Sequence, residues 1–489
     1  MTIISTHNTI QPLHTGKPAW SNSEKFFFRI AFLFFILLIV PLEKEWYARL
    51  FSDFSFYKLL SALAGARPGL IDIHTESGKW GLASYTTWGA FLAVSIIGAI
   101  IWTFAAQKKG RKEYNVLYYW LRVFVRYRVA IGSIAFGFIK FFPMQMPFPS
   151  ISNLHTNFGD YAPFKLYWQS VGLSLWYEIF LGTLEILIGV LLFFRSTTAI
   201  GAILTAGIFY NIAHANLGYD GGVHVYSSFF VIQALFLLVQ YIPDIWKLFI
   251  KRQTVVPNHY YPEYTSRSKR FSYILTKSVF IILFLVFTGY NRYDLHYNQG
   301  RLKEPIVPGL KGFEGHYLVK TFLKNGSPLS YSPLDSVRWH DAVFERYSTF
   351  SYKVYKPFQI SIGNGVPDGS DIFKEYEFTG RAGGRVYLYY EIDSLYNDLY
   401  LVDKGQNFST RIKKKLANKD FLNLKQLYTT PLKDTLGILQ WHYVKINENA
   451  IELSGLDQHQ DPINVVLERI PEVYTTGKSW YSENKKFTY

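Results

Sequence analysis

Seven apolar runs of membrane-spanning length constrain this chain more than any other feature. They lie at 25–41, 86–104, 120–142, 170–194, 197–217, 223–242 and 271–290, and basic loops separate several of them. Crossing about 30 Å of hydrocarbon takes about 20 helical residues. Because only helices and closed barrels satisfy all backbone hydrogen bonds in lipid, the runs predict a polytopic α-helical membrane bundle of about seven spans.

Lysine and arginine in the short loops predict the orientation of this bundle. They follow the second, fourth and sixth runs, at Lys108, Lys109, Arg111, Lys112, Arg195, Lys247, Lys251, Arg252, Arg267, Lys269 and Arg270. Basic loop residues stay on the cytoplasmic side. The first run is expected to remain as an anchor, since LIVPLEKEW offers no small-residue cleavage site. We predict a bacterial inner-membrane protein with a cytoplasmic N-terminus and a periplasmic C-terminal domain.

The net charge and the lack of cysteine limit the classes of function. The chain of 489 residues carries 51 Lys and Arg against 36 Asp and Glu, a net charge of +15. Much of this charge flanks membrane spans, so we expect membrane lipid and no nucleic acid as a partner. The absence of cysteine excludes thiol relays, disulfides and cysteine-bound zinc or iron–sulfur clusters. Chemistry with a bound quinone, flavin or haem stays open.

After residue 290 the chain changes to short segments with period-two alternation. These segments lie at 316–323, 358–363, 386–392, 398–403, 439–446, 450–456 and 463–470. The pattern is typical of antiparallel strands and predicts a β-rich, lipocalin-like barrel or sandwich. Apolar spacing from Leu334 to Phe350 predicts an amphipathic helix that covers or plugs this domain. The domain either binds a ligand or is a passive cap that docks an envelope protein partner.

These features divide the chain into six parts. We expect a cytoplasmic N-terminal segment (1–24), accessory spans one and two with their loops (25–127), a four-helix core (128–242), a basic cytoplasmic linker (243–270), a seventh span (271–290) and the β-rich periplasmic domain (291–489).

A proline-rich break interrupts the bundle between Gly137 and Phe164. Lys140 lies at the end of the third run, and a series of prolines that cannot continue a helix begins at Pro143. A charged side chain at membrane depth must snorkel, form an ion pair or line a wet cavity. Non-helical backbone survives there only where protein or water satisfies it. We name residues 143–164 the lip and expect it to border a cavity.

Two runs carry polar residues and glycines at helical spacing. Glu178, Gly182, Glu185 and Gly189 recur on the fourth run, and Gly207, Asn211, His214 and Gly218 recur on the fifth. Both faces are expected to point into the bundle, where glycine lets helices approach closely. The turn GYDGG (218–222) joins the fifth and sixth runs at the outer end, which the lip also reaches.

We therefore predict a polar cluster at the outer end of the bundle. The catalytic candidates are Lys140 as charge partner or base, Glu185 as its buried counter-charge, and His214. The ligand-binding candidates are Gln145, His155, Glu178, Asn211, Asp220 and His224. A lysine or histidine whose pKa is shifted by burial suits proton handling or ligand binding. No metal ligands are predicted.

Purely structural roles are the alternative for these residues. Glu185 then only pairs with Lys140, and Asn211 only joins helices by hydrogen bonds. His214 and His224 near the interface are weak candidates for haem ligands. No run carries the Glu-x-x-His pairs of a di-iron site.

Several segments of the core resemble the DoxX-like membrane protein family, in a branch where a four-helix unit precedes a soluble domain. They are GFIKFFPMQMPFP (137–149), FGDYAP (158–163), WYEIFLGTLEILIG (176–189), RSTTAIGA (195–202) and NIAHANLGYDGGVHVYS (211–227). The tail GKSWYSENKKF (477–487) is similar to the ending of that branch. The family pattern has a lysine where this chain has His224, so the family role of that position does not carry over.

The resemblance implies a quinone-associated or redox-associated membrane subunit. The wider group is similar in helix layout to vitamin K-dependent carboxylases, which implies a lysine that deprotonates a hydroquinone, here Lys140. We therefore expect an outward-facing site for a quinone, isoprenoid or lipid-type molecule in an envelope redox-linked process. The alternative is a non-catalytic subunit or assembly factor of a larger cell-envelope complex.

Overall fold

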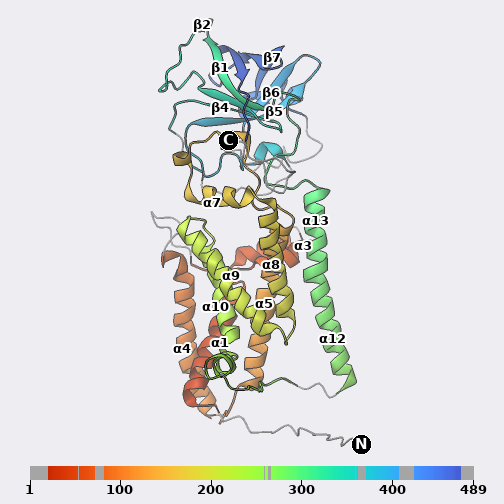
Figure 1. The fold of residues 1–489 in the computed structure, drawn as a ribbon. Helices are drawn as coiled ribbons and strands as arrows, with labels where there is room; N and C mark the ends of the chain where they lie inside the picture. The colour runs from red at the N-terminus through yellow and green to blue at the C-terminus, as the bar shows by residue number, and fades with distance from the viewer. Residues whose placement is uncertain are drawn as a thin grey trace, which may run out of the picture.

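A helical bundle and a β-barrel are stacked end to end, with short helices of the lip between them (Figure 1). The computed structural model describes residues 20–474, except 53, 72–81, 109, 258, 263–265, 358–359, 362–369 and 407–422. The tail motif at 477–487 and most of the expected strand at 358–363 lie outside the described residues. The described parts confirm the expected class, a polytopic helical bundle followed by a β-rich barrel.

The bundle contains long helices joined by short helical segments. The elements before the lip are α1 (Asn22–Ile39), α2 (Lys44–Ser52), α3 (Phe56–Gly65), η1 (Leu82–Tyr85), α4 (Thr86–Lys108) and α5 (Asn115–Phe141). The lip and the segment that follows contain α6 (Ile151–Leu154), η2 (Phe158–Asp160) and α7 (Pro163–Gly172). Then come α8 (Leu175–Phe193), α9 (Thr198–Gly218), α10 (His224–Val239), α11 (Ile242–Ile245), η3 (Trp246–Ile250), α12 (Arg267–Ile281), η4 (Ile282–Phe287) and α13 (Thr288–Tyr297).

Several of these helices have the length and composition to cross a membrane. Among the described residues, 4 helices qualify, at Thr86–Lys108, Leu175–Phe193, Thr198–Gly218 and Arg267–Tyr297, or up to 6 if two bent pairs count as single spans. The bent pairs are α1 with α2 and α10 with α11 and η3. Of the seven expected spans, α5 is the one outside this set, and it carries three arginines and Lys140. The last helix runs on to Tyr297, beyond the expected end at residue 290.

Helices α5 and α8 pack closely along a glycine contact. A Cβ added to Gly182 would lie 2.4 Å from the Phe141 nitrogen and 2.6 Å from the Gly137 oxygen. A Cβ added to Gly189 would lie 2.7 Å from the Ala130 oxygen. Because backbone atoms stand in the way, neither position tolerates a side chain without moving a helix. The expected inward face of the fourth run is confirmed, with all four of its residues buried.

The prediction that this polar face of the fifth run points into the bundle is wrong. Gly207, Asn211, His214 and Gly218 are all exposed on the surface of α9. The face that packs into the bundle instead carries Thr198, Gly201, Ala202, Thr205, Phe209, Ala213 and Asn216. Both faces have the same helical spacing, so the sequence pattern does not distinguish them. Packing selected the face whose small and apolar residues fit α8 and α10.

The C-terminal domain is a closed antiparallel barrel. Its strands are β1 (Gly315–Lys324), β2 (Ser327–Pro328), β3 (Asp341–Phe344), β4 (Thr349–Lys353), β5 (Arg385–Asp393), β6 (Asp398–Asp403), β7 (Leu439–Asn447), β8 (Ala450–Leu456) and β9 (Pro462–Arg469). They form one sheet in the order β2-β1-β3-β4-β5-β6-β7-β8-β9. Strand β9 also pairs with β1, which closes the sheet, and two-residue β2 is an appendage of β1. This is the order of an up-and-down barrel.

Aromatic side chains fill much of the barrel interior. Phe344 packs against Phe350 at a ring-centroid distance of 4.7 Å, and Trp339 lies 5.5 Å from Trp441. A cavity of about 90 Å³ remains, with Trp339, Tyr352 and Trp441 among its lining residues. Most of the interior is therefore a packed core.

The prediction of an amphipathic helix from Leu334 to Phe350 is wrong. This segment contains turns, then β3 and the start of β4. Asp335 accepts backbone hydrogen bonds from Val337 at 2.7 Å and Arg338 at 3.0 Å, which stabilises a turn where the helix was expected. Short apolar runs fit helical and strand periods equally well, and barrel closure decides between them.

The lip docks onto one end of the barrel (Figure 1). Buried Glu345 accepts hydrogen bonds from the backbone nitrogens of Ile151 at 2.8 Å and Ser152 at 2.9 Å. The Ala162 nitrogen donates to the Gly380 oxygen at 2.9 Å. Backbone donors of the lip, at the start of α6 and just before α7, thus find their partners in the barrel.

Candidate functional site

Lys140 and Glu185 form a buried bidentate ion pair between α5 and α8. The lysine nitrogen lies 2.9 Å from each carboxylate oxygen, and the two residues are 7% and 1% exposed. The expected pairing of Lys140 with a buried counter-charge is confirmed. Because both oxygens of the carboxylate hold the ammonium group, this geometry favours a structural role for Lys140 over the role of base.

Glu178, which lies about two turns before Glu185 on the same face of α8, holds the lip in place. Its Oε1 accepts hydrogen bonds from the backbone nitrogens of Gln145 at 3.2 Å and Met146 at 3.1 Å. These donors follow the point where α5 ends and prolines prevent another turn. Glu178 therefore positions the lip, and the side chain of Gln145 lines a cleft beside it.

The structure does not assemble the remaining candidates around Lys140. Asn211 and His214 lie exposed on α9, and Asp220 is exposed in the following turn. The His214 ring lies beside the Tyr210 ring, with 4.4 Å between the centroids and 46° between the ring planes. The predicted cluster does not form, because α9 presents the face that carries Asn211 and His214 away from the packed bundle.

Two histidines of the expected cluster have partners elsewhere. Buried His224 lies 3.1 Å from the Ser84 hydroxyl through its Nε2 atom. His155, in the lip, faces the barrel and stacks on His316 at 3.8 Å between ring centroids. The lip thus divides the expected cluster, with Glu178 and Gln145 on the bundle side and His155 on the barrel side.

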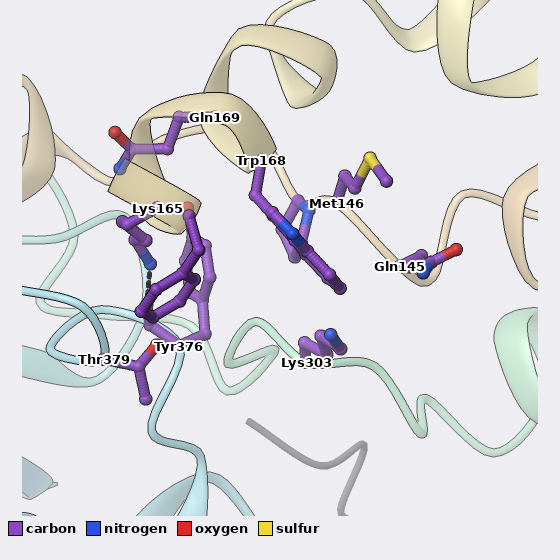
Figure 2. A pocket seen from close by; sticks show the side chains of 10 residues that line it. Gln145, Met146, Lys165, Trp168, Gln169, Lys303, Tyr376 and Thr379 are labelled. Atoms are coloured by element: carbon purple, nitrogen blue, oxygen red, sulfur yellow. Dashed lines mark hydrogen bonds between the residues drawn. The ribbon is translucent and has the colours of Figure 1, made fainter. Parts of the chain in front are cut away.

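A cleft lies where the lip, α7 and the barrel meet (Figure 2). It is lined by Gln145, Met146, Pro147, Phe164, Lys165, Trp168, Gln169, Lys303, Tyr376 and Thr379. Its volume of about 20 Å³ accommodates about one water molecule. Within the described chain, Gln145 Oε1 and Gln169 Nε2 are buried without a hydrogen-bond partner. The cleft walls therefore carry unused hydrogen-bonding capacity.

Lys165 of α7 is a buried amine beside this cleft. Its Nζ donates a hydrogen bond to the Tyr376 carbonyl oxygen and lies 4.6 Å from the Tyr376 ring centroid (Figure 2). Loss of hydration on burial lowers the pKa of Lys165 to about 7, and the nearby Glu377 carboxylate only partly opposes this effect. At neutral pH, a large fraction of the protein molecules therefore carry Lys165 as a neutral amine, which can accept a proton.

Lys303 reaches the same cleft from the segment between α13 and β1. Its Nζ lies 4.5 Å from the centroid of the Trp168 ring. Burial lowers the pKa of Lys303 to about 8, while the carboxylates of Glu178 and Glu304 favour its charged form. The cleft thus combines two amines whose pKa values burial lowers, that of Lys165 further than that of Lys303.

Sequence reasoning missed both lysines. Lys165 lies two residues after the FGDYAP motif, but a lysine among aromatic residues also fits an interfacial position. Lys303 joins the cleft across more than a hundred residues of chain, and no local pattern marks it. Only the docking of lip and barrel brings the two amines to one cleft.

Comparisons with known proteins place this chain in no established family. No family model matches it, and no solved structure matches it. "Uncharacterized protein YwoB" of Bacillus subtilis (strain 168) is similar to it, with 39% identity over 90 residues. The match covers 17% of this chain and 58% of that protein. That name assigns no activity, so the local geometry carries the functional argument.

Proposed function

We propose that this chain is a DoxX-like protein of the bacterial inner membrane that binds a quinone, isoprenoid or other lipid-type molecule at the cleft between lip, α7 and barrel. The barrel would then lie in the periplasm and the N-terminus in the cytoplasm, as the basic loops predict. The single observation that supports this function is the presence of two buried lysines with lowered pKa at one cleft beside the membrane bundle.

The location of the cleft suits an amphipathic molecule. Exposed apolar side chains surround the bundle end, including Phe148 at 42%, Leu175 at 52% and Trp176 at 66% exposure. A hydrocarbon tail in the bilayer would contact this surface, while a polar head enters between the lip and α7. The small volume of the cleft means that Gln145 and Met146 must shift before a head group larger than water fits.

The chemistry of the cleft suits a head group with oxygen atoms. Lys303 supplies a cationic donor, and the neutral fraction of Lys165 accepts a proton from a hydroxyl group. Gln145 Oε1 and Gln169 Nε2 offer one acceptor and one donor. A quinol or a lipid hydroxyl has the matching groups. The proton-accepting role that the family resemblance placed on Lys140 moves to Lys165 in this proposal.

Lipid analysis of native preparations tests this function. The full chain would be extracted with surrounding lipid in polymer discs, and its lipids compared by mass spectrometry with those of Lys165→Met and Lys303→Met variants. The control is Lys320→Met, which removes a lysine of β1 with a 60% exposed side chain. We expect one lipid class enriched in wild type and in the control but lost in both cleft variants. Equal lipid content in all four would contradict the proposal.

A non-catalytic role in an envelope complex is the second candidate. The packed barrel interior and the exposed Asn211 and His214 of α9 favour it, since both leave surface rather than cavity for function. In that case a protein would co-purify through the barrel, with the same yield in the Lys165→Met variant.

A further inference from the structure

Three side chains with metal-ligand chemistry meet on the barrel side of the lip. His155 follows α6, His316 lies on β1, and Glu472 lies just after β9. One ligand atom from each residue lies within 4.8 Å of the others. Glu472 bridges the two histidines, with Oε2 at 2.6 Å from His155 Nε2 and Oε1 at 3.2 Å from His316 Nδ1.

The two imidazole rings form a close stacked pair. Their centroids lie 3.8 Å apart, with 24° between the ring planes. Two protonated rings would repel each other strongly at this distance. Imidazole binds metals in its neutral form, so a close pair of this kind suits a shared metal ion.

Hydrogen bonding leaves part of this cluster unsatisfied. His316 Nε2 is buried and has no hydrogen-bond partner in the described chain. Asp341 Oδ1 lies 3.9 Å from this nitrogen, beyond hydrogen-bonding distance. His155 Nε2 has the Tyr474 hydroxyl at 2.9 Å as a further neighbour. The Glu472 carboxylate and the Tyr474 hydroxyl thus contact the two imidazoles, while one ring nitrogen, His316 Nε2, has no hydrogen-bond partner in the described chain.

We propose that His155, His316 and Glu472 bind a divalent transition-metal ion, with zinc as the favoured metal. Two imidazoles and one carboxylate are a donor set of zinc sites that keep a fourth position open. Bonds of about 2.0–2.2 Å place tetrahedral ligand atoms about 3.3 Å apart. Two of the present separations, 2.6 Å and 3.2 Å, lie below that value and all three lie within 4.8 Å, so side-chain rotation completes the site.

Such an ion would join three separate segments at the junction of the two domains. His155 belongs to the lip, His316 to the first barrel strand, and Glu472 to the segment after the last strand. The metal would therefore fix the barrel to the bundle and hold residues 470–474 against the lip. It shares no residue with the lysine cleft, so this inference does not depend on the proposed lipid site.

Metal analysis of the intact chain tests this site. The full-length protein would be purified in detergent without a polyhistidine tag, stripped with a chelator, and dialysed against zinc before elemental analysis. We expect about one zinc ion per chain in wild type, and binding at least about tenfold weaker in Glu472→Gln and His316→Gln. Zinc should also raise the thermal unfolding midpoint of wild type and leave that of Glu472→Gln unchanged.

Two controls make the outcome decisive. His442→Gln removes a histidine of β7 whose side chain is 48% exposed, and it should bind zinc as wild type does. Lys165→Met should also retain zinc, which separates this test from the lipid proposal. If His316→Gln fails to fold, Glu472→Gln decides, since its carboxylate is partly exposed near the end of the described chain. Equal zinc affinity in wild type and Glu472→Gln would overturn the assignment.

Discussion

Replacing one member of the Lys140–Glu185 pair should destabilise the bundle strongly. Lys140→Met leaves the Glu185 carboxylate in a site where it is 1% exposed and has lost both 2.9 Å contacts. Removing one partner of a buried pair costs about 3–5 kcal/mol, because an uncompensated charge stays in the protein interior. The double variant Lys140→Met/Glu185→Met removes both charges and should recover most of that loss.

Titration with sodium dodecyl sulfate in mixed micelles, followed by tryptophan fluorescence, measures this effect as a change in unfolding free energy. The matched control is Lys320 with Glu468, an ion pair at 2.8 Å whose side chains are 60% and 46% exposed. Its disruption by Lys320→Met should cost about 0–1 kcal/mol, since water screens it. The reasoning is wrong if Lys140→Met costs no more than the control, or if the double variant is as unstable as the sum of its single variants.

Three further predictions concern burial and packing. The pKa of Lys165 is about 7 in the folded chain and 10.5 as its ordinary value. Between these two pH values the unfolded state binds the proton that the folded state has lost. The free energy of unfolding therefore rises with pH in this range, by up to about 1.4 kcal/mol per pH unit. Unfolding midpoints at pH 7.5 and 9 should show this rise in wild type, reduced in Lys165→Met; identical slopes would refute it. Gly182→Ala should cost about 1–3 kcal/mol because its Cβ meets backbone atoms, whereas Gly207→Ala has nothing within 4 Å and should be neutral or slightly stabilising in the same titration. Glu345→Gln should cost about 1–3 kcal/mol and speed proteolysis of the lip, because one backbone donor then faces the amide NH2 group and the other keeps only a neutral acceptor; unchanged cleavage would argue against docking by this residue.

Membrane helices and most barrel strands were predictable because their patterns are local. Apolar runs of bilayer length marked the helices, and period-two alternation marked six of the barrel strands, including β5, β6 and β8. Strands β3 and β4 were missed, since their short apolar runs also match a helical period. Their true conformation depends on pairing with β1 and β5, which are distant in sequence.

The candidate site likewise contains contacts that the sequence predicted and contacts that only the tertiary structure decided. Pairing of Lys140 with Glu185 was predictable, because each lies on the inner face of its helix and a lone charge there is costly. The positions of Asn211 and His214 were not predictable, because α9 has two faces with equal helical spacing. Only packing against the neighbouring helices decides which of these faces is buried. Lys165, Lys303 and the pair of His155 with His316 depend on docking between domains, for which the chain carries no local signal.

The amino-acid sequence by itself determined that this chain forms a membrane bundle with a β-barrel, and that helix α5 cannot continue into the lip. Burial of apolar surface and backbone hydrogen bonding impose those outcomes on each segment separately. Only the tertiary structure decided which polar groups meet, because the lip finds its hydrogen-bond partners in Glu345 and Gly380 of the barrel. That docking buries two lysines in one cleft and stacks two histidines beside a carboxylate, arrangements that no single segment encodes.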